Sequence, residues 1–369
     1  MTEASLKDKF YGCICASWIG SAMGATVEGW PYERTEEIYG TLATLEPYEH
    51  YDNGWMCTPG TTEDGIERQK MISTAIIEKK DRVTAEDVRA IWCRDMNPKA
   101  PGNVSEPFEY NLLAMAKAGI PARDIGRFCD YSNLVSFARA CHPIGLINAG
   151  DEKGAIEDVM EVGQLYHASN SKALKWASVT AVAIASAAKP HATTDSVIQA
   201  IYDHCDDRQD AHGRDGWYPK WAGLAIAEEI QNAMAATKDC KNFRELRVAL
   251  NKIYFAYGIP YSQAFANEIV TRAVCVFRMT DGNVKDAIIA AVNLGRDTDC
   301  AAAVAAGIAG ALSGTETLPT EWIEQVDYAT TQNPFTNSKR TMRETADGLY
   351  EAYEGRLNKA RALAAAMGL

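Results

Sequence analysis

The chain of 369 residues carries a net charge of −12, from 37 basic and 49 acidic side chains. This balance argues against nucleic-acid or anionic-membrane partners, because both require a basic surface. With 47% apolar and 23% charged residues, the composition is that of a soluble globular protein with a large core. No apolar run reaches the length of a membrane span, and we expect no secretory signal.

The ten cysteines are scattered along the chain and form no C-x₂-C pair. This spacing does not suggest a zinc site. Scattered cysteines in a chain without a signal are typical of reduced, buried thiols. We therefore predict a cytoplasmic protein.

The first predicted helix covers residues 5–26, which are apolar and rich in Ala, Gly and Ser. Three glycines recur in it at intervals of four or eight residues, at Gly12, Gly20 and Gly24. This interval puts them on one helix face, where small residues allow close helix packing. Glu28 follows the end of this helix, and residues 31–60 are predicted to form a loop with a break at Pro59-Gly60.

The segment TTEDG at residues 61–65 leads into the helical run IERQKMISTAIIEKK. Thr61 and Asp64 have the spacing of a helix-capping signature. The same segment offers hydroxyl and carboxylate oxygens, which are ligands for hard divalent ions. Taken alone, the segment leaves both interpretations open.

Helical patterns dominate the middle of the chain. Thr84 is a predicted N-cap, and helical periodicity is seen at residues 110–118, 152–167, 171–188, 220–237, 242–257, 262–280 and 283–292. Residues 95–110 hold three prolines and are predicted to be a surface loop crossing the active face, while the polar residues 203–220 are predicted to be an exposed loop. Without strand alternation or internal repeats, we predict an all-α, compact single domain spanning residues 1–369.

The stretch NLGRDTDCAAAVAAGIAGALSG, residues 293–314, begins with a polar turn and continues into small apolar side chains. We predict a central, buried helix with Asp297 and Asp299 at its start. Such carboxylates can cap the free N–H groups of a helix, but one of them is enough for that role. A D-x-D pair is also a ligand set for Mg²⁺ or Ca²⁺. Capping and metal binding both remain open on this stretch alone.

Four segments together resemble the ADP-ribosylglycohydrolase family, which includes the dinitrogenase reductase-activating enzymes. Residues 20–28, GSAMGATVE, are similar to its G-D-A-x-G-x-x-x-E entry, and residues 55–65, WMCTPGTTEDG, to W-x-P-G leading into T-D-D-T. Residues 139–146, RACHPIGL, resemble R-x-x-P-I-G-L, and residues 295–300, GRDTDC, resemble G-G-D-T-D-T. His167 falls where the family has Thr-His ahead of a helix. The order of these segments spans nearly the whole chain.

The resemblance implies an all-α fold holding two adjacent Mg²⁺ ions, with Mn²⁺ as the other candidate. It implies that one side of the metal site comes from Thr62, Glu63 and Asp64, the other side from Asp297 and Asp299, and the rim from Glu28. Two metal ions can bind a ribose diol and orient a water near the anomeric carbon. Glu28 or Asp64 would be the catalytic general base or acid.

Four further residues are predicted to bind substrate. Arg296 replaces the usual Gly of the motif and would bind a phosphate or carboxylate group of the ligand. His142 and His167 are assigned through the resemblance, although His142 is equally interpretable as a satisfied core histidine. Asn133, in the predicted turn 130–133, completes the set.

The sequence departs from the family motifs at several places. Ser21 stands where Asp is usual, Glu63 is longer than Asp, and the last Thr of the two acidic motifs is replaced by Gly65 and Cys300. Cys300 exchanges a hydroxyl ligand for a soft thiol that Mg²⁺ does not favour. These changes leave the acidic residues of the motifs in place, but they indicate a substrate that differs from the ADP-ribosylated proteins of the family.

The predicted function is a metal-dependent glycohydrolase. It would cleave an N- or O-glycosidic bond of ribosyl type, in an ADP-ribosylated substrate or a small riboside. Two alternatives stay open: a non-catalytic relative that binds ADP-ribose or a similar nucleotide, and a structural protein that forms oligomers. The sequence leaves the oligomeric state undetermined.

Overall fold

The computed structural model describes residues 3–49, 54–100, 107–169, 171–205, 225–254 and 264–368. Within these ranges the chain folds into α-helices joined by short 3₁₀ helices, and the only sheet is a two-stranded hairpin. The prediction of an all-α fold is therefore confirmed. Of the predicted loop 203–220, residues 206–220 lie outside the described ranges.

The elements follow one another in this order. The first half holds α1 (Leu6–Gly24), η1 (Ala25–Val27), α2 (Tyr32–Tyr39), β1 (Tyr48–Glu49), β2 (Met56–Cys57), α3 (Asp64–Lys79), α4 (Ala85–Asp95), α5 (Pro107–Lys117), α6 (Ala122–Ile125), η2 (Gly126–Phe128), η3 (Val135–Phe137), α7 (His142–Ile147), α8 (Glu152–Val162), η4 (Gly163–Leu165) and α9 (Lys172–Ala187). The second half holds α10 (Thr194–Cys205), α11 (Ile226–Thr237), α12 (Phe243–Ile253), α13 (Ala266–Met279), α14 (Val284–Val292), α15 (Thr298–Ser313), α16 (Thr320–Gln332) and α17 (Met342–Ala366).

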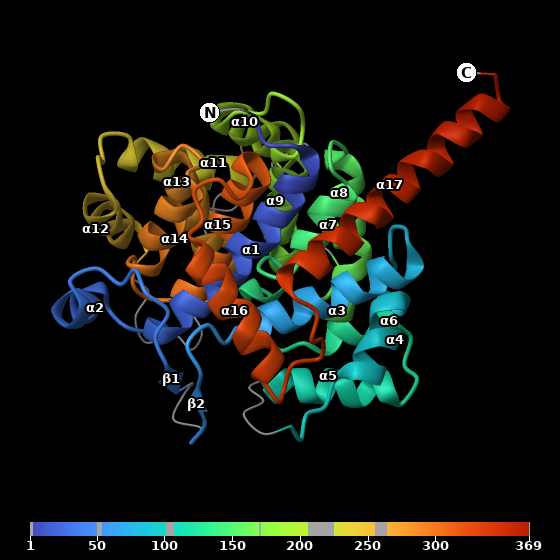
Figure 1. Ribbon diagram of the computed structural model, residues 1–369, viewed down its shortest axis with the longest axis horizontal. Helices are drawn as coiled ribbons and strands as arrows, with labels where there is room; N and C mark the ends of the chain where they lie inside the picture. The colour runs from blue at the N-terminus through green and yellow to red at the C-terminus, as the bar shows by residue number, and fades with distance from the viewer. Residues whose placement is uncertain are drawn as a thin grey trace, which may run out of the picture.

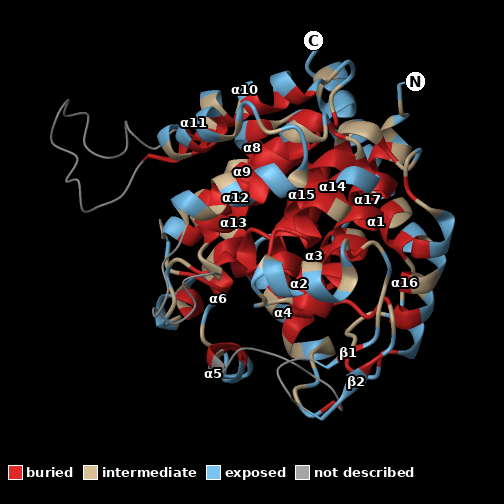
Figure 2. Cartoon of the chain, turned by 90° about the vertical axis from the view of Figure 1, so that its left-hand side faces the viewer, coloured by how far each residue is buried: buried red, intermediate tan, exposed pale blue. Residues whose placement is uncertain are grey.

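Helices α1 and α15 pack against each other at the centre of the molecule (Figure 1). Both are buried along nearly their whole length, as the red colour of Figure 2 shows. Their backbones approach closely through glycine: a Cβ on Gly12 would lie 2.6 Å from the backbone of Gly314. The predicted small-residue face of the first helix and the predicted central helix are thus confirmed, and they are partners.

Contrary to the expectation from the sequence, the segment Leu6–Val27 is long and apolar enough, by length and composition alone, to cross a membrane. However, 94% of its apolar window is buried inside the protein. The other helices surround it, so its apolar character is explained by its place in the core.

Several elements differ from the predictions. The predicted loop 31–60 contains α2 and the antiparallel hairpin, in which Tyr48 pairs with Cys57. Pro143, which the sequence favours as the end of a helix, lies instead in the first turn of α7, where its missing N–H is not needed. Helices α10, α16 and α17 were not predicted, and the end of α17 extends away from the body in Figure 1.

Candidate functional site

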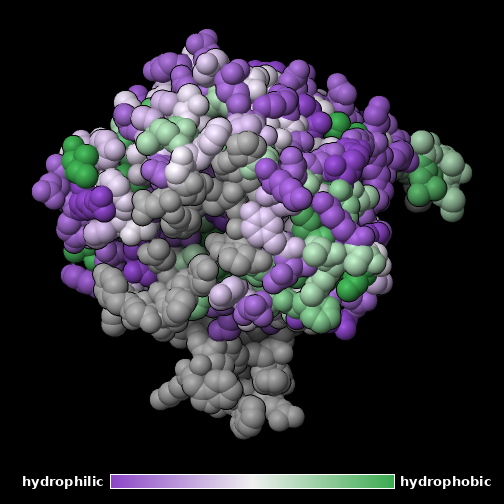
Figure 3. Space-filling model, turned by 90° about the horizontal axis from the view of Figure 1, so that it is seen from below, coloured by the Kyte–Doolittle hydropathy of each residue, from purple (hydrophilic) through white to green (hydrophobic). Residues whose placement is uncertain are grey.

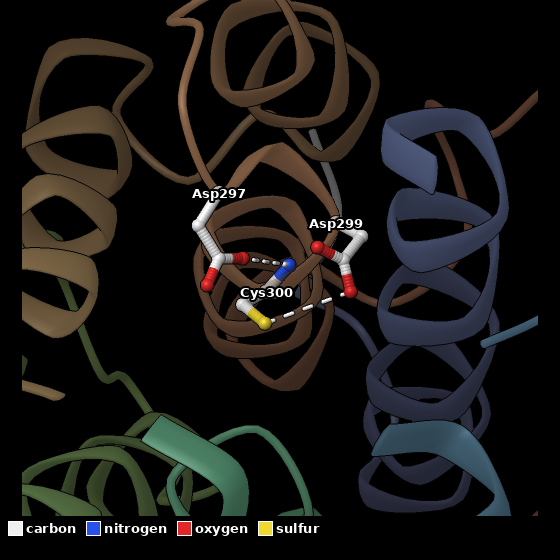
Figure 4. A group of neighbouring side chains, drawn as sticks. All are labelled: Asp297, Asp299 and Cys300. Atoms are coloured by element: carbon white, nitrogen blue, oxygen red, sulfur yellow. Dashed lines mark hydrogen bonds between the residues drawn. The ribbon is translucent and has the colours of Figure 1, made fainter. Parts of the chain in front are cut away.

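The first part of the site is the start of α15. Asp297 is the N-cap residue, and its Oδ1 accepts a hydrogen bond from the Cys300 N–H at 3.3 Å. Asp299 lies in the first turn, so the two carboxyl groups flank the Cys300 side chain (Figure 4). Gly24 fixes the approach of α1, because a Cβ there would lie 2.5 Å from Cα of Asp299. Asp297 therefore caps the helix, and Asp299 has no capping role.

The turn before α15 is tied to the segment that carries Glu28. Gly295 and Arg296 both adopt left-handed backbone conformations, with φ of 75° and 72°. The Gly29 N–H donates to the Arg296 carbonyl at 2.7 Å, and the Arg296 N–H donates to the Trp30 carbonyl at 2.8 Å. These reciprocal bonds hold the residue after Glu28 beside the acidic turn.

The start of α3 supplies the second acidic segment. Glu63, not Thr61, is the N-cap, and its carboxylate accepts from the Gly65 N–H at 3.4 Å. The helix start that the segment allowed is confirmed, but Thr61 is not its cap; the Thr61 hydroxyl donates to the Thr58 carbonyl at 2.7 Å. Thr62 is buried, with its Oγ1 3.5 Å from Nζ of Lys70. Asp64 is the first residue of the helix and is also buried.

The three segments converge on one place. Ligand atoms of Glu28, Glu63 and Asp299 lie within 4.8 Å of one another, and so do those of Asp297, Asp299 and Cys300. Oδ1 of Asp299 is buried and accepts no hydrogen bond from the described part of the chain. Oxygen atoms gathered in this way, one of them without a donor, fit a hard divalent cation. We name Glu28, Glu63, Asp64, Asp297 and Asp299 the carboxylate cluster.

Two arginines that the sequence analysis gave no role contact this cluster. Arg139 donates from Nη1 to Glu63 and Asp299, at 2.9 and 3.0 Å, and from Nη2 to Asp64 at 2.5 Å. Arg68 donates to Asp64 and, through Nε, to Glu109, both at 2.5 Å. The position of Arg68 four residues after Asp64 on a predicted helix was a usable signal for this pair. Nothing in the sequence pointed to Glu109.

Burial dominates the electrostatics of the cluster. It raises the pKa of Asp64 to about 6, although Arg139 and Arg68 act in the opposite direction. Burial also raises the pKa of Asp297 and Asp299, and nearby negative charges, including that of Glu28, add to the effect in both. Burial and mutual repulsion thus disfavour the charged forms of these carboxyl groups, and a cation bound among them would favour those forms.

A pocket of about 540 Å³ lies beside the cluster. This volume is in the range of small-molecule sites. Its lining includes Thr26, Glu28, Trp30, Arg34, Tyr39, Tyr48, Glu49 and Met56. These residues come from η1 and the turn that follows it, from α2, and from the hairpin. Figure 3 views the end of the molecule that carries the hairpin, and this face is hollowed near its centre.

Glu28 joins the pocket to the cluster, since it belongs to both. Tyr48 also lines the pocket, and its hydroxyl donates to the Thr61 carbonyl at 3.1 Å, just before the start of α3. The Arg34 guanidinium lies 3.8 Å from the centre of the Trp30 ring. A ligand in this pocket would therefore meet aromatic rings, the Arg34 cation and the Glu28 carboxylate of the cluster.

The predicted substrate residues are not brought together at the pocket. Arg296 forms a bidentate, buried ion pair with Glu268, at 2.6 and 3.0 Å. Asn133 is half-buried, and its carbonyl accepts from the Ala266 N–H at 2.8 Å. The assignment of Arg296 and Asn133 to substrate binding stays a prediction.

The two predicted histidines are fully buried. His142 lies 3.1 Å from Nε2 of Gln69 through Nδ1 and 2.9 Å from the Ala303 carbonyl through Nε2, so it is a satisfied core histidine in this structure. His167 Nε2 lies 2.8 Å from the Ser136 hydroxyl. Burial lowers the pKa of His142 to about 4 and that of His167 to about 3. Neither ring lines the pocket beside the cluster.

Comparison with known proteins gives a likeness of fold and a family. A solved structure described as an "ADP-ribosylglycohydrolase-related protein complex" matches with a TM-score of 0.61 over 95% of this chain and 99% of that chain. Its sequence identity of 15% makes this a likeness of fold. No curated protein matches the chain. A family model described as ADP-ribosylglycohydrolase matches residues 2–359, so the chain belongs to the ADP-ribosylglycohydrolase family.

Proposed function

We propose that the protein is a metal-dependent glycohydrolase that cleaves an N- or O-glycosidic bond of ribosyl type. The observation that carries this proposal is the convergence of four carboxylates, from the segment after η1 and the starts of α3 and α15, beside a pocket of about 540 Å³. Asp64, the fifth member of the cluster, is joined to them through Arg139. Membership of the ADP-ribosylglycohydrolase family supports a hydrolase acting on glycosyl bonds.

The carboxylate cluster suits Mg²⁺, and Mn²⁺ as the alternative, because its donors are hard oxygens. When bound, such an ion would polarise the sugar oxygens and lower the pKa of a water. The chain's own carboxylates would orient that water and the ribose hydroxyls by accepting their hydrogen bonds. Cys300 contributes little to an ion of this kind, since burial raises the pKa of its thiol and keeps it neutral.

Of the two predicted catalytic residues, Glu28 has the better position for proton transfer. It lines the pocket, whereas Asp64 is buried and both of its oxygens accept from arginines. A residue must reach the reacting group before its pKa matters. We assign Glu28 as general base or acid, and Asp64 as the residue that orders Arg139 and Arg68.

The pocket lining favours a substrate with a flat ring and a negative charge. Trp30, Tyr39 and Tyr48 offer aromatic surface, and Arg34 offers a cation beside it. Flat rings stack on aromatic side chains, and guanidinium groups bind phosphate oxygens. An ADP-ribosylated molecule or a small phosphorylated riboside meets both conditions.

The test is sugar release from a panel of ribosides, including ADP-ribosyl-arginine and ADP-ribosyl-serine peptides, with Mg²⁺ and with chelator. We expect chelator-sensitive release that falls by about 10²- to 10⁴-fold in Glu28→Gln, the usual contribution of a general acid or base. Glu33→Gln, on the exposed first turn of α2, is the matched control and should keep full activity.

Release that persists unchanged in chelator would overturn the metal requirement. If no member of the panel is cleaved, and one of them raises the melting temperature only when Mg²⁺ is present, the protein is a nucleotide-binding relative without catalysis.

A cytoplasmic location is part of the proposal. All ten cysteines are free thiols in the structure, as a reducing compartment would leave them.

A further inference from the structure

A guanidinium lies inside the carboxylate cluster. Nη1 of Arg139 donates at once to Oε2 of Glu63 and Oδ2 of Asp299, and Nη2 donates to Oδ1 of Asp64. These carboxylates stand at the starts of α3 and α15, so Arg139 joins the two acidic segments. A divalent ion shared between the two helices would need the same oxygens. Its charge would also repel the guanidinium at short range in a buried site.

Two neighbouring residues make room for this guanidinium. A Cβ on Gly65 would lie 2.6 Å from Cδ and 2.7 Å from Nε of Arg139, so a larger residue there would displace the side chain. Cys300 Sγ accepts from Nη1 at 3.0 Å, and its thiol lies 3.5 Å from Oδ2 of Asp299. Positions 65 and 300 are also those at which the last Thr of each acidic motif is missing. Both departures thus face the same arginine.

The other side of the cluster still has the features of a cation site. Oδ1 of Asp299 is buried and accepts no hydrogen bond from the described residues. Glu28 brings a ligand atom within 4.8 Å of those of Glu63 and Asp299, and Asp297 brings one equally close to Asp299. The residues therefore fit one divalent ion, but they do not fit a second ion between the starts of α3 and α15.

We propose that the Arg139 guanidinium takes the place of one cation, so that this chain binds a single divalent metal ion. The ion is held by Asp297 and Asp299, and Glu28 lies at its rim, where its carboxylate faces the pocket. This inference rests on the proposed function only in requiring that the carboxylate cluster binds metal. It differs from the two-ion site that the sequence analysis expected.

The test counts bound Mn²⁺ per chain by equilibrium dialysis at saturating metal. We expect one ion in the wild-type protein and two in Arg139→Met, which removes the charge and keeps an unbranched side chain. Arg247→Met is the matched control. Arg247 is as deeply buried but is paired with Glu36. Its variant should still bind one ion.

If Arg139→Met does not fold, Gly65→Thr provides the second measurement. Its Cβ forces the Arg139 side chain out of the cluster without removing any charge from the chain, and we again expect two ions. Two ions in the wild-type protein, or one ion in a folded Arg139→Met or Gly65→Thr, would overturn the inference. One ion without any sugar release leaves the inference standing and overturns the proposed function, whereas no ion overturns both.

Discussion

Gly24 lies against the backbone of Asp299 with no room for a side chain, since a Cβ would come within 2.5 Å of the Asp299 Cα. The contact sets how closely the end of α1 approaches the carboxylate cluster. We predict that Gly24→Ala pushes the start of α15 away. This overpacking should cost about 1–3 kcal/mol of unfolding free energy and also weaken Mn²⁺ binding. Urea denaturation and metal titration measure the two effects.

Gly12→Ala is the control for Gly24→Ala. Gly12 lies on the same helix with an equally close contact, 2.6 Å from the backbone of Gly314 for an added Cβ. The two glycines are twelve positions apart, which is about 18 Å along the helix. Gly12→Ala should therefore destabilise the fold to a similar extent and leave metal affinity unchanged. Equal loss of affinity in both variants would show that Gly24 has no special relation to the site.

A second prediction separates the two roles of Asp297. Asn is as good an N-cap as Asp, so Asp297→Asn keeps the hydrogen bond from the Cys300 N–H while it removes the charge. We expect at least about a tenfold loss of Mn²⁺ affinity, about 1.4 kcal/mol, with little loss of stability. Isothermal titration with Asp286→Asn, an exposed acid in the first turn of α14, as the control measures this. Normal affinity in Asp297→Asn would remove Asp297 from the metal site.

A third prediction concerns the buried ion pairs of Arg68. Asp64 and Glu109 both accept from its guanidinium, and all three residues are at most 7% exposed. Removing one partner of a buried pair leaves uncompensated charge, at a cost of about 3–5 kcal/mol. Arg68→Met should therefore lose that much stability in urea denaturation. Adding Glu109→Leu should restore part of it, and a loss in Arg68→Met below about 1 kcal/mol would contradict the prediction.

The sequence predicted those parts of the site whose functional side chains lie close together within one short segment. A D-x-D pair before a run of small residues indicates both a buried helix and acids at its start, because both features lie in one short segment. The hairpin at Tyr48 was missed, since strands of two residues offer no alternation to detect. Arg139 was quoted in a motif but given no role. It reaches two helix starts far from it in sequence, and no spacing rule encodes such a contact.

The last prediction concerns the acid stability of the fold. His142 is fully buried, and burial lowers its pKa to about 4 from an ordinary value near 6.5. A lowered pKa in the folded state means that its contribution to stability is complete above pH 6.5 and is lost as the pH falls towards 4, by up to about 1.4 kcal/mol per pH unit. In His142→Gln this loss is absent, so the unfolding free energies of variant and wild type should converge between pH 6.5 and 4. Parallel curves for His142→Gln and wild type would mean that His142 does not enter the fold as a neutral ring.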